Sequence, residues 1–178
     1  MMAMPAVCFN NEDFYQKVLA IIKKLVPTAE QIIPASNQEN AYQMVLQLAK
    51  KHTNRNKILI LENPIIFDGT ISDSRDKDIE IIPADNAALL CETIAISAER
   101  IAAIIVKHDK ASNYYYKKVR ELSSAEGAVM IWDNLHQPSI KADATLNMSK
   151  KSFPDLICFN LNNVWIGGRS DLMSLISC

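Results

Sequence analysis

The feature that most constrains the fold of this chain is a set of short, almost uninterrupted runs of aliphatic residues. KILILE (57–62), RIAAIIVK (100–107) and AVMIWD (128–133) lack the polar alternation of a half-exposed strand. Such runs are typical of parallel strands that helices cover on both faces. Helical segments at 36–52, 85–99 and 112–127 separate them. This alternation of strand and helix predicts an α/β protein.

Further apolar segments extend the predicted sheet. The remaining strands are expected at 30–35, 78–84, 156–160 and 164–168, and an amphipathic helix is expected at 11–27. Asn162-Asn163 lies between the last two runs and favours a tight turn, so the last strand should run antiparallel to its predecessor. We therefore predict a single domain over residues 1–178, a three-layer α/β fold with a seven-stranded, mostly parallel sheet and an antiparallel last hairpin strand.

Composition excludes several classes of protein. The net charge of −1 argues against a nucleic-acid-binding protein, which normally has a basic excess. Apolar runs such as 101–106 are too short to cross a membrane, and the N-terminus does not resemble a signal peptide. The cysteines at 8, 91, 158 and 178 form no CxxC pair. Cys91 and Cys158 are predicted to be buried free thiols, which favours the cytoplasm.

Polar residues at the carboxyl ends of the predicted strands are the candidates for chemistry. They are Glu62, Lys107, His108, Asp109, Asp133, Asn134, His136 and Asn160. A metal or acid–base cluster of His108, Asp109, Asp133 and His136 is one interpretation. Ordinary polar groups satisfied by backbone and water are the better supported one, because no metal-ligand spacing is present. We predict no metal site, and no nucleophile motif of the G-x-S-x-G type occurs.

The helix that begins near residue 36 is the candidate anion site. Ser36 and Glu39 have the spacing of a capping box, in which the two side chains satisfy the free amides of the helix. The opening Ser36-Asn37-Gln38 could instead bind an anion at the helix N-terminus. Self-capping is favoured, because a phosphate is usually held by glycine-rich, bare backbone.

The order of these segments resembles the large domain of class III pyridoxal-phosphate (PLP) aminotransferases, especially the glutamate-1-semialdehyde aminomutase branch. LVPTAEQIIPASNQENAYQMVLQLAKKHTNRNKILILEN (25–63) is similar to the family's helix, P-x-A-E strand, S-G-[ST]-E-A turn and following helix and strand. IAAIIVK and VRELSSAEGAVMIWDNL (119–135) follow in the family's order. FPDLICF and IGGRSDLM complete the series. The resemblance implies the fold-type-I aminotransferase large domain.

The resemblance also implies what has changed at the cofactor positions. Asp133 matches the aspartate that contacts the pyridine nitrogen, while Asn37-Gln38 replaces the G-[ST] of the phosphate turn. Ile65-Ile66 stands where the family has its aromatic-histidine pair. Leu161 falls at the position of the Schiff-base lysine, and the glycine-rich passage after it is missing. Asp133, Ser36, Asn37 and Gln38 are thus expected to be a vestigial cofactor site, with no catalytic residue.

A non-catalytic scaffold without PLP is the function that this comparison implies, in a chain expected to lack the family's N-terminal segment and C-terminal small domain. The alternative is weak PLP-dependent aminotransferase or aminomutase activity, with a lysine from a partner chain or with Lys107, Lys150 or Lys151 as a substitute. Family members are dimers, so a homodimer or pairing with another aminotransferase-like chain is expected.

Overall fold

The computed structural model describes residues 16, 17, 19, 20, 23, 30–62, 77–97, 100–107, 113–134, 153–160 and 164–168. Residues 16, 17, 19, 20 and 23 are helical, within the helix predicted at 11–27. The sequence also predicts a short helix in SDLMSLIS (170–177), and this segment lies outside the described residues.

Strands and helices alternate along the described part of the chain. The strands are β1 (Gln31–Ala35), β2 (Lys57–Glu62), β3 (Ile79–Pro83), β4 (Ile101–Lys107), β5 (Val129–Asn134), β6 (Leu156–Asn160) and β7 (Val164–Gly168). The helices are α2 (Gln38–Thr53), α3 (Ala87–Ser97) and α4 (Asn113–Ala125).

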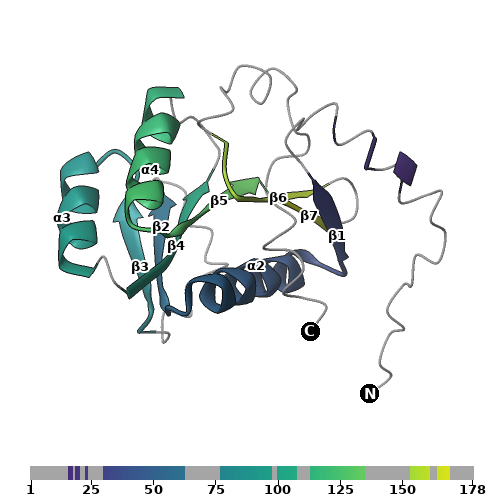
Figure 1. Ribbon diagram of the computed structural model, residues 1–178, viewed down its shortest axis with the longest axis horizontal. Helices are drawn as coiled ribbons and strands as arrows, with labels where there is room; N and C mark the ends of the chain where they lie inside the picture. The colour runs from purple at the N-terminus through teal and green to yellow at the C-terminus, as the bar shows by residue number, and fades with distance from the viewer. Residues whose placement is uncertain are drawn as a thin grey trace.

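All the described strands belong to one sheet (Figure 1). Its seven strands have the order β1-β7-β6-β5-β4-β2-β3. The pairs β2–β3, β2–β4, β4–β5 and β5–β6 are parallel. β7 is antiparallel to both β6 and β1. The mostly parallel α/β sheet with an antiparallel last hairpin is therefore confirmed.

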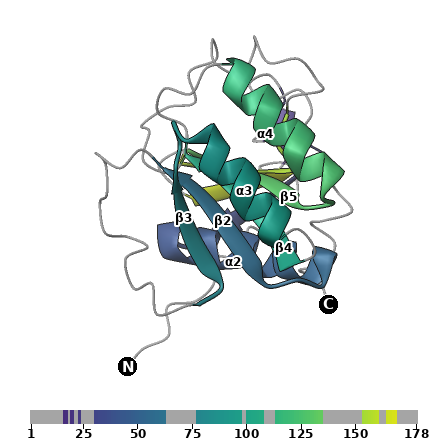
Figure 2. The ribbon, with the colours of Figure 1, turned by 90° about the vertical axis from the view of Figure 1, so that its left-hand side faces the viewer.

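Helices cover both faces of the sheet (Figures 1 and 2). α3 and α4 lie on one face, where Leu90, Ile94 and Val119 pack on residues such as Leu59 and Ile104. α2 lies on the opposite face, where Val45 and Leu48 belong to a second apolar cluster. Burial on both faces explains why the central strands contain so few polar residues.

The start of α2 corrects one prediction. The N-cap is Asn37, which lies two residues after β1 in an extended conformation and whose Oδ1 accepts a hydrogen bond from the Asn40 amide at 2.7 Å. Asn40 Nδ2 in turn donates to Ser36 Oγ at 2.7 Å. The capping box predicted for Ser36 and Glu39 is therefore wrong: the helix begins one residue later, so Asn37 satisfies the free amide.

Glycine and asparagine end two of the helices in the left-handed conformation. Asn54 follows α2 with φ 54° and Gly127 follows α4 with φ 62°. Gly127 is the last residue of the helix predicted at 112–127, and it takes this conformation because glycine adopts positive φ without steric strain. Arg55, which follows α2, connects this end of α2 to the start of β4 and to the end of α4. Its guanidinium donates to the carbonyls of Ile101 and Glu126 at 3.2 and 2.6 Å.

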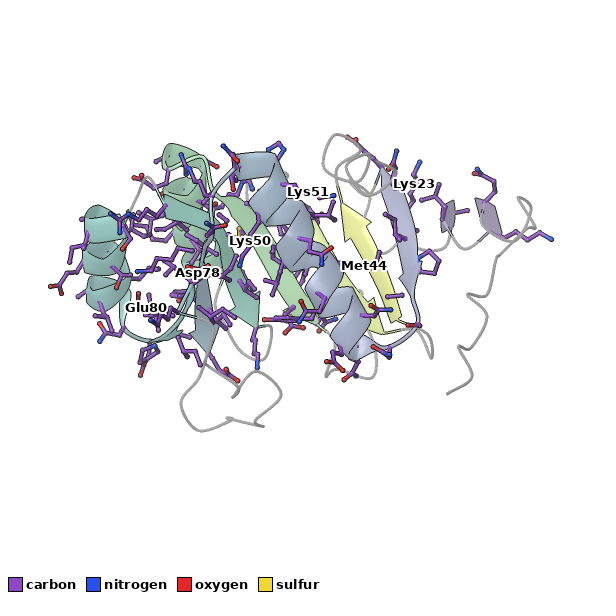
Figure 3. All side chains as sticks on the ribbon, turned by 90° about the horizontal axis from the view of Figure 1, so that it is seen from below. Lys23, Met44, Lys50, Lys51, Asp78 and Glu80 are labelled. Carbon is purple, nitrogen blue, oxygen red and sulfur yellow. The ribbon has the colours of Figure 1, made fainter. Side chains whose placement is uncertain are left out.

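Charged side chains at the amino end of the sheet connect its edge to α2 (Figure 3). Lys50 of α2 approaches Asp78, next to β3, with an Nζ–Oδ2 distance of 3.9 Å. Both side chains are partly exposed, so this ion pair contributes little to stability.

None of the described helices is long and apolar enough to cross a membrane.

Candidate functional site

Four polar residues from neighbouring strands meet at the carboxyl end of the sheet, on the face that α2 covers. They are Glu62 of β2, Lys107 of β4, Asp133 of β5 and Cys158 of β6, called here the carboxyl-edge row. Lys107 pairs in register with Asp133, and Asp133 with Cys158. In-register residues of adjacent strands point to the same face. Across the sheet, the row thus consists of the acidic Glu62, the basic Lys107, the acidic Asp133 and the thiol of Cys158.

Asp133, the predicted pyridine-binding residue, is almost completely buried. It is 3% exposed, and Cys158 beside it is fully buried. Burial, and secondarily the charge of Asp133, raises the pKa of the Cys158 thiol well above its usual value. Cys158 thus stays a neutral thiol at physiological pH and is a poor nucleophile. The prediction that Cys158 is a buried free thiol is confirmed.

Lys107 forms an ion pair with Glu62, so its amine is not free to react with a ligand beside Asp133. Its Nζ lies 2.6 Å from Glu62 Oε1, and the two side chains are 15% and 5% exposed. Neutralisation of each charge by the other permits burial of both groups. Among the described strands, Lys107 is the only lysine at a carboxyl end.

The start of α2 lies at the same edge of the sheet as Asp133, but not next to it. β1 leads into Ser36 and Asn37, and the register places Ala35 level with Val164, which pairs with Asn160 of β6. The order β1-β7-β6-β5 leaves three inter-strand spacings between β1 and Asp133, roughly 14 Å. Ser36, Asn37 and Gln38 are exposed there.

The connection between β6 and β7 is short. Asn160 at the end of β6 pairs with Val164 at the start of β7, so only Leu161, Asn162 and Asn163 join the strands. Their placement lies outside the described residues. The sequence of this connection contains no lysine, and its length leaves no room for a glycine-rich passage.

Several predicted candidates also lie outside the described residues: His108, Asp109, His136, Lys150 and Lys151. The proposed cluster of histidines and aspartates is therefore not tested. Within the described ranges, no group of at least three histidine, cysteine or acidic side chains could hold a metal ion. Asn134, next to Asp133, ends β5 and is buried, and its alternation with Asp133 directs it to the α4 face.

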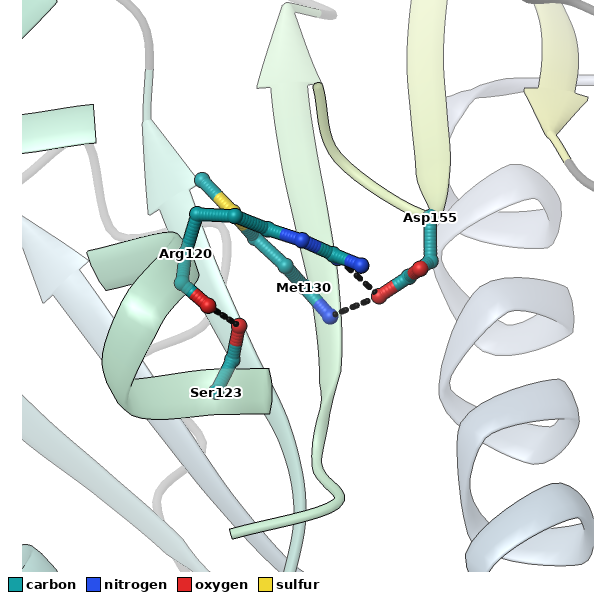
Figure 4. Close-up of polar contacts among 4 residues, drawn as sticks. All are labelled: Arg120, Ser123, Met130 and Asp155. Atoms are coloured by element: carbon teal, nitrogen blue, oxygen red, sulfur yellow. Dashed lines mark hydrogen bonds and ion pairs between the residues drawn. The ribbon is translucent and has the colours of Figure 1, made fainter. Parts of the chain in front are cut away.

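An aspartate just before β6 is the important polar residue that the sequence interpretation missed (Figure 4). Asp155 Oδ2 accepts hydrogen bonds from the Met130 amide at 2.9 Å and from Arg120 Nη1 at 2.6 Å. The Asp155 amide donates to the Met130 carbonyl at 2.9 Å. One side chain thus connects α4, β5 and β6. The one signal in the sequence for this connecting role was the position of Asp155 directly before the apolar run LICF (156–159).

Cys91 corrects a second prediction, because it is exposed on α3 rather than buried. Its segment is apolar on every side of the helix, so composition did not reveal which side faces the sheet. The structure therefore separates the two described thiols into an accessible one and an inaccessible one.

The raised pKa of Cys158 predicts a specific pH dependence of stability. Above about pH 8.5 the unfolded thiol ionises while the folded thiol keeps its proton, so the free energy of unfolding should fall by about 1.4 kcal/mol per pH unit. Below that pH both states bind the proton and the contribution is constant. Urea unfolding of the wild type and of Cys158→Ala between about pH 7 and about pH 9.5, a range that brackets the ordinary thiol pKa of about 8.5, checks this.

The difference in stability between the wild type and Cys158→Ala should shrink as the pH rises. Cys91→Ala serves as the matched control, and its difference from the wild type should not follow this trend, because Cys91 is exposed. A pH-independent difference for Cys158→Ala would contradict the buried, neutral thiol.

Comparison with solved structures places this architecture among known folds. A β-phenylalanine aminotransferase from Variovorax paradoxus matches with a TM-score of 0.76 and 18% identity, over 94% of this chain and 43% of that one. An omega-transaminase from Sphaerobacter thermophilus matches with 0.72 and 16%, over 97% and 47%. A taurine:2-oxoglutarate aminotransferase from Bifidobacterium kashiwanohense, solved with PLP and glutamate, matches with 0.72 and 13%, over 99% and 51%. The sequence matches no protein-family model.

These likenesses establish the fold. The chain has the fold of the PLP-dependent aminotransferases, as the resemblance in the sequence implied. It spans about half the length of each of these three structures. At identities below 20% the shared fold does not transfer an activity.

Proposed function

We propose that this chain is a non-catalytic, aminotransferase-like scaffold that acts by binding other proteins. The observation that carries the proposal is the connection between β6 and β7. Register leaves only Leu161, Asn162 and Asn163 between the strands. Covalent attachment of PLP requires an amine at this place, and Leu161, which the resemblance aligns with the Schiff-base lysine, supplies an alkyl group instead.

The other cofactor positions support the same conclusion. A phosphate at the start of α2 would need free backbone amides, but the Asn37 side chain already accepts from the Asn40 amide. Lys107, the substitute nearest to Asp133 in the described sheet, is held by Glu62 in a mostly buried pair. The groups present therefore fit PLP poorly, apart from Asp133.

We expect no stoichiometric PLP adduct on this protein. The purified chain is incubated with PLP and reduced with borohydride, and the modified lysines are mapped by mass spectrometry. Exposed lysines should react weakly and at scattered positions, because Leu161 stands where the resemblance places the Schiff-base lysine. The absorbance of PLP should not change on titration with the protein.

An Asp133→Asn variant is the matched control for this experiment. It keeps the size of the side chain and removes the charge that would hold a pyridine nitrogen. If the wild type formed one dominant adduct, or an absorbance change that Asp133→Asn abolished, the non-catalytic proposal would be wrong.

The second candidate is a PLP-dependent aminotransferase or aminomutase that needs a partner chain to supply the lysine. Its specific support is Asp133, a buried carboxylate at the carboxyl ends of the strands, where open α/β sheets usually bind their ligands. This candidate requires turnover of an amino donor and a keto acid in a mixture of the two chains. The adduct experiment with the mixture distinguishes it from a scaffold.

As the resemblance of the sequence to class III aminotransferases implies, the proposed scaffold works as a dimer or paired with another aminotransferase-like chain. Light scattering after size exclusion tests the homodimer, and a strict monomer would contradict it.

The free thiols of Cys91 and Cys158 favour a reducing compartment, such as the cytoplasm, as the place of action.

A further inference from the structure

Helix α3 exposes apolar surface that no described part of the chain covers. Of its residues, only Leu90, Thr93, Ile94 and Ser97 are buried against the sheet. Leu89 and Ile96 are 36% and 78% exposed, and they are the large hydrophobic residues that stand out on the described surface. A helix that is apolar on all sides is normally surrounded by protein. Here the outer side faces away from the sheet (Figure 2).

The exposed residues of α3 form an ordered surface. Leu89 and Ile96 are seven residues apart, close to two helical turns, and therefore lie on one line along the helix. Ala88 and Ala95 form a parallel line of small side chains with the same spacing. Glu92 lies between the two lines. We call these residues the α3 surface: Ala88, Leu89, Glu92, Ala95 and Ile96.

Shape and spacing of the α3 surface suit another helix. Small residues at seven-residue spacing allow a neighbouring helix to approach closely, while Leu89 and Ile96 provide a ridge that fits between its side chains. Exposed ridges of this kind at i and i+7 are used when an amphipathic helix docks on a partner. An 11-residue helix is about 16 Å long, so the contact involves two or three turns of the partner.

Charge distinguishes between possible partners. Glu92 is the only ionisable carboxylate or amine within α3, and it is the central residue of the helix. Two copies that paired across a two-fold axis through α3 would bring Glu92 against Glu92, because the central residue of an antiparallel pair meets its own copy. Like charges at a contact oppose binding, so a second copy of this chain is disfavoured. A basic residue is the complementary group.

We propose that the α3 surface is a docking site for an amphipathic helix of a different protein, one that presents aliphatic residues around a central lysine or arginine. Leu89 and Ile96 contact the aliphatic residues, Ala88 and Ala95 allow the close approach, and Glu92 pairs with the base. The inference rests on the proposed scaffold function and names the class of partner that the scaffold binds.

Two synthetic peptides test this proposal against the intact chain. Both are about 15 residues long, the length at which isolated helices begin to form, with leucines along one face and either lysine or glutamate at the centre of that face. Isothermal titration calorimetry should show at least about tenfold tighter binding of the lysine peptide. Glu92→Lys should reverse the preference, so that the glutamate peptide binds more tightly.

Two further variants separate the apolar and general electrostatic contributions. Ile96→Ser should weaken both peptides about tenfold, and it should fold normally because Ile96 is 78% exposed. Glu121→Lys changes an exposed glutamate on α4 instead, and it should leave the preference for the lysine peptide unchanged. A preference that Glu121→Lys also reversed, or that Glu92→Lys left intact, would overturn the proposal.

Other occupants of the α3 surface give different results. A concentration-dependent dimer that Ile96→Ser dissociates would show that a second copy binds there, and would overturn the proposal. Failure of both peptides to bind at about 1 mM would do the same. Neither result tests the non-catalytic scaffold function. That function is contradicted by a stoichiometric PLP adduct, by an absorbance change that Asp133→Asn abolishes, or by transamination.

Discussion

Asp155→Ala is expected to lower the free energy of unfolding by about 3–5 kcal/mol, a large part of the stability of a domain of this size. Asp155 is 5% exposed, and its carboxylate accepts from both Arg120 and the Met130 amide. Alanine removes two charge-assisted hydrogen bonds and leaves the Met130 N–H buried without its acceptor. Urea unfolding at neutral pH measures the loss.

The two contributions of Asp155 can be separated with matched variants. Asp155→Asn keeps an oxygen for the Met130 amide but weakens the pair with Arg120, so its loss of stability should be clearly smaller than that of Asp155→Ala. Arg120→Ala leaves the buried carboxylate without its cation, and the double variant measures the coupling between the two residues. A loss below about 1 kcal/mol for Asp155→Ala would show that the connection does not stabilise the fold.

Lys107→Met is the second change with a large expected effect, again about 3–5 kcal/mol. It removes the cation that lies 2.6 Å from Glu62, whose side chain is 5% exposed. The buried Glu62 carboxylate then loses the positive charge of Lys107 that neutralises it. Replacing both partners, as Glu62→Gln with Lys107→Met, should restore most of the loss, because two neutral groups need no compensation.

The surface offers a control for this pair. Lys57 and Glu80 form an ion pair of 2.7 Å at the other end of β2, but their side chains are 24% and 42% exposed. Glu80→Gln should therefore change the stability by less than about 1 kcal/mol. Equal effects at the two pairs, measured by the same urea unfolding, would contradict the argument that burial makes the Lys107–Glu62 pair important.

The fold could be predicted from the sequence to a large extent, because its signals are local. The predicted runs at 57–62, 100–107 and 128–133 are apolar because both faces of these strands are covered, and they correspond to β2, β4 and β5. The β6–β7 hairpin followed from the asparagines between two apolar runs. Helix starts were less certain, since neighbouring Ser36 and Asn37 can both act as caps and only the backbone conformation selected Asn37.

The candidate site could be predicted only in part. The resemblance and the spacing of the segments placed Asp133 at the carboxyl end of β5, and it lies there in register with Lys107 and Cys158. The ion pair between Lys107 and Glu62 joins residues 45 positions apart, and Asp155 reaches Arg120 over 35 positions. No local pattern marks such pairs, because they depend on which strands become neighbours in the sheet.

Sequence alone determined the succession of strands and helices, because burial on two faces leaves its mark on every central strand. Tertiary structure decided which side chains meet and which remain exposed. In α3 the hydrophobic residues surround the helix, so no periodicity showed that Leu90 and Ile94 face the sheet while Cys91 and Ile96 face outward. The orientation of that helix is set by packing against β-strands far along the chain, and it created the surface to which we assign a partner.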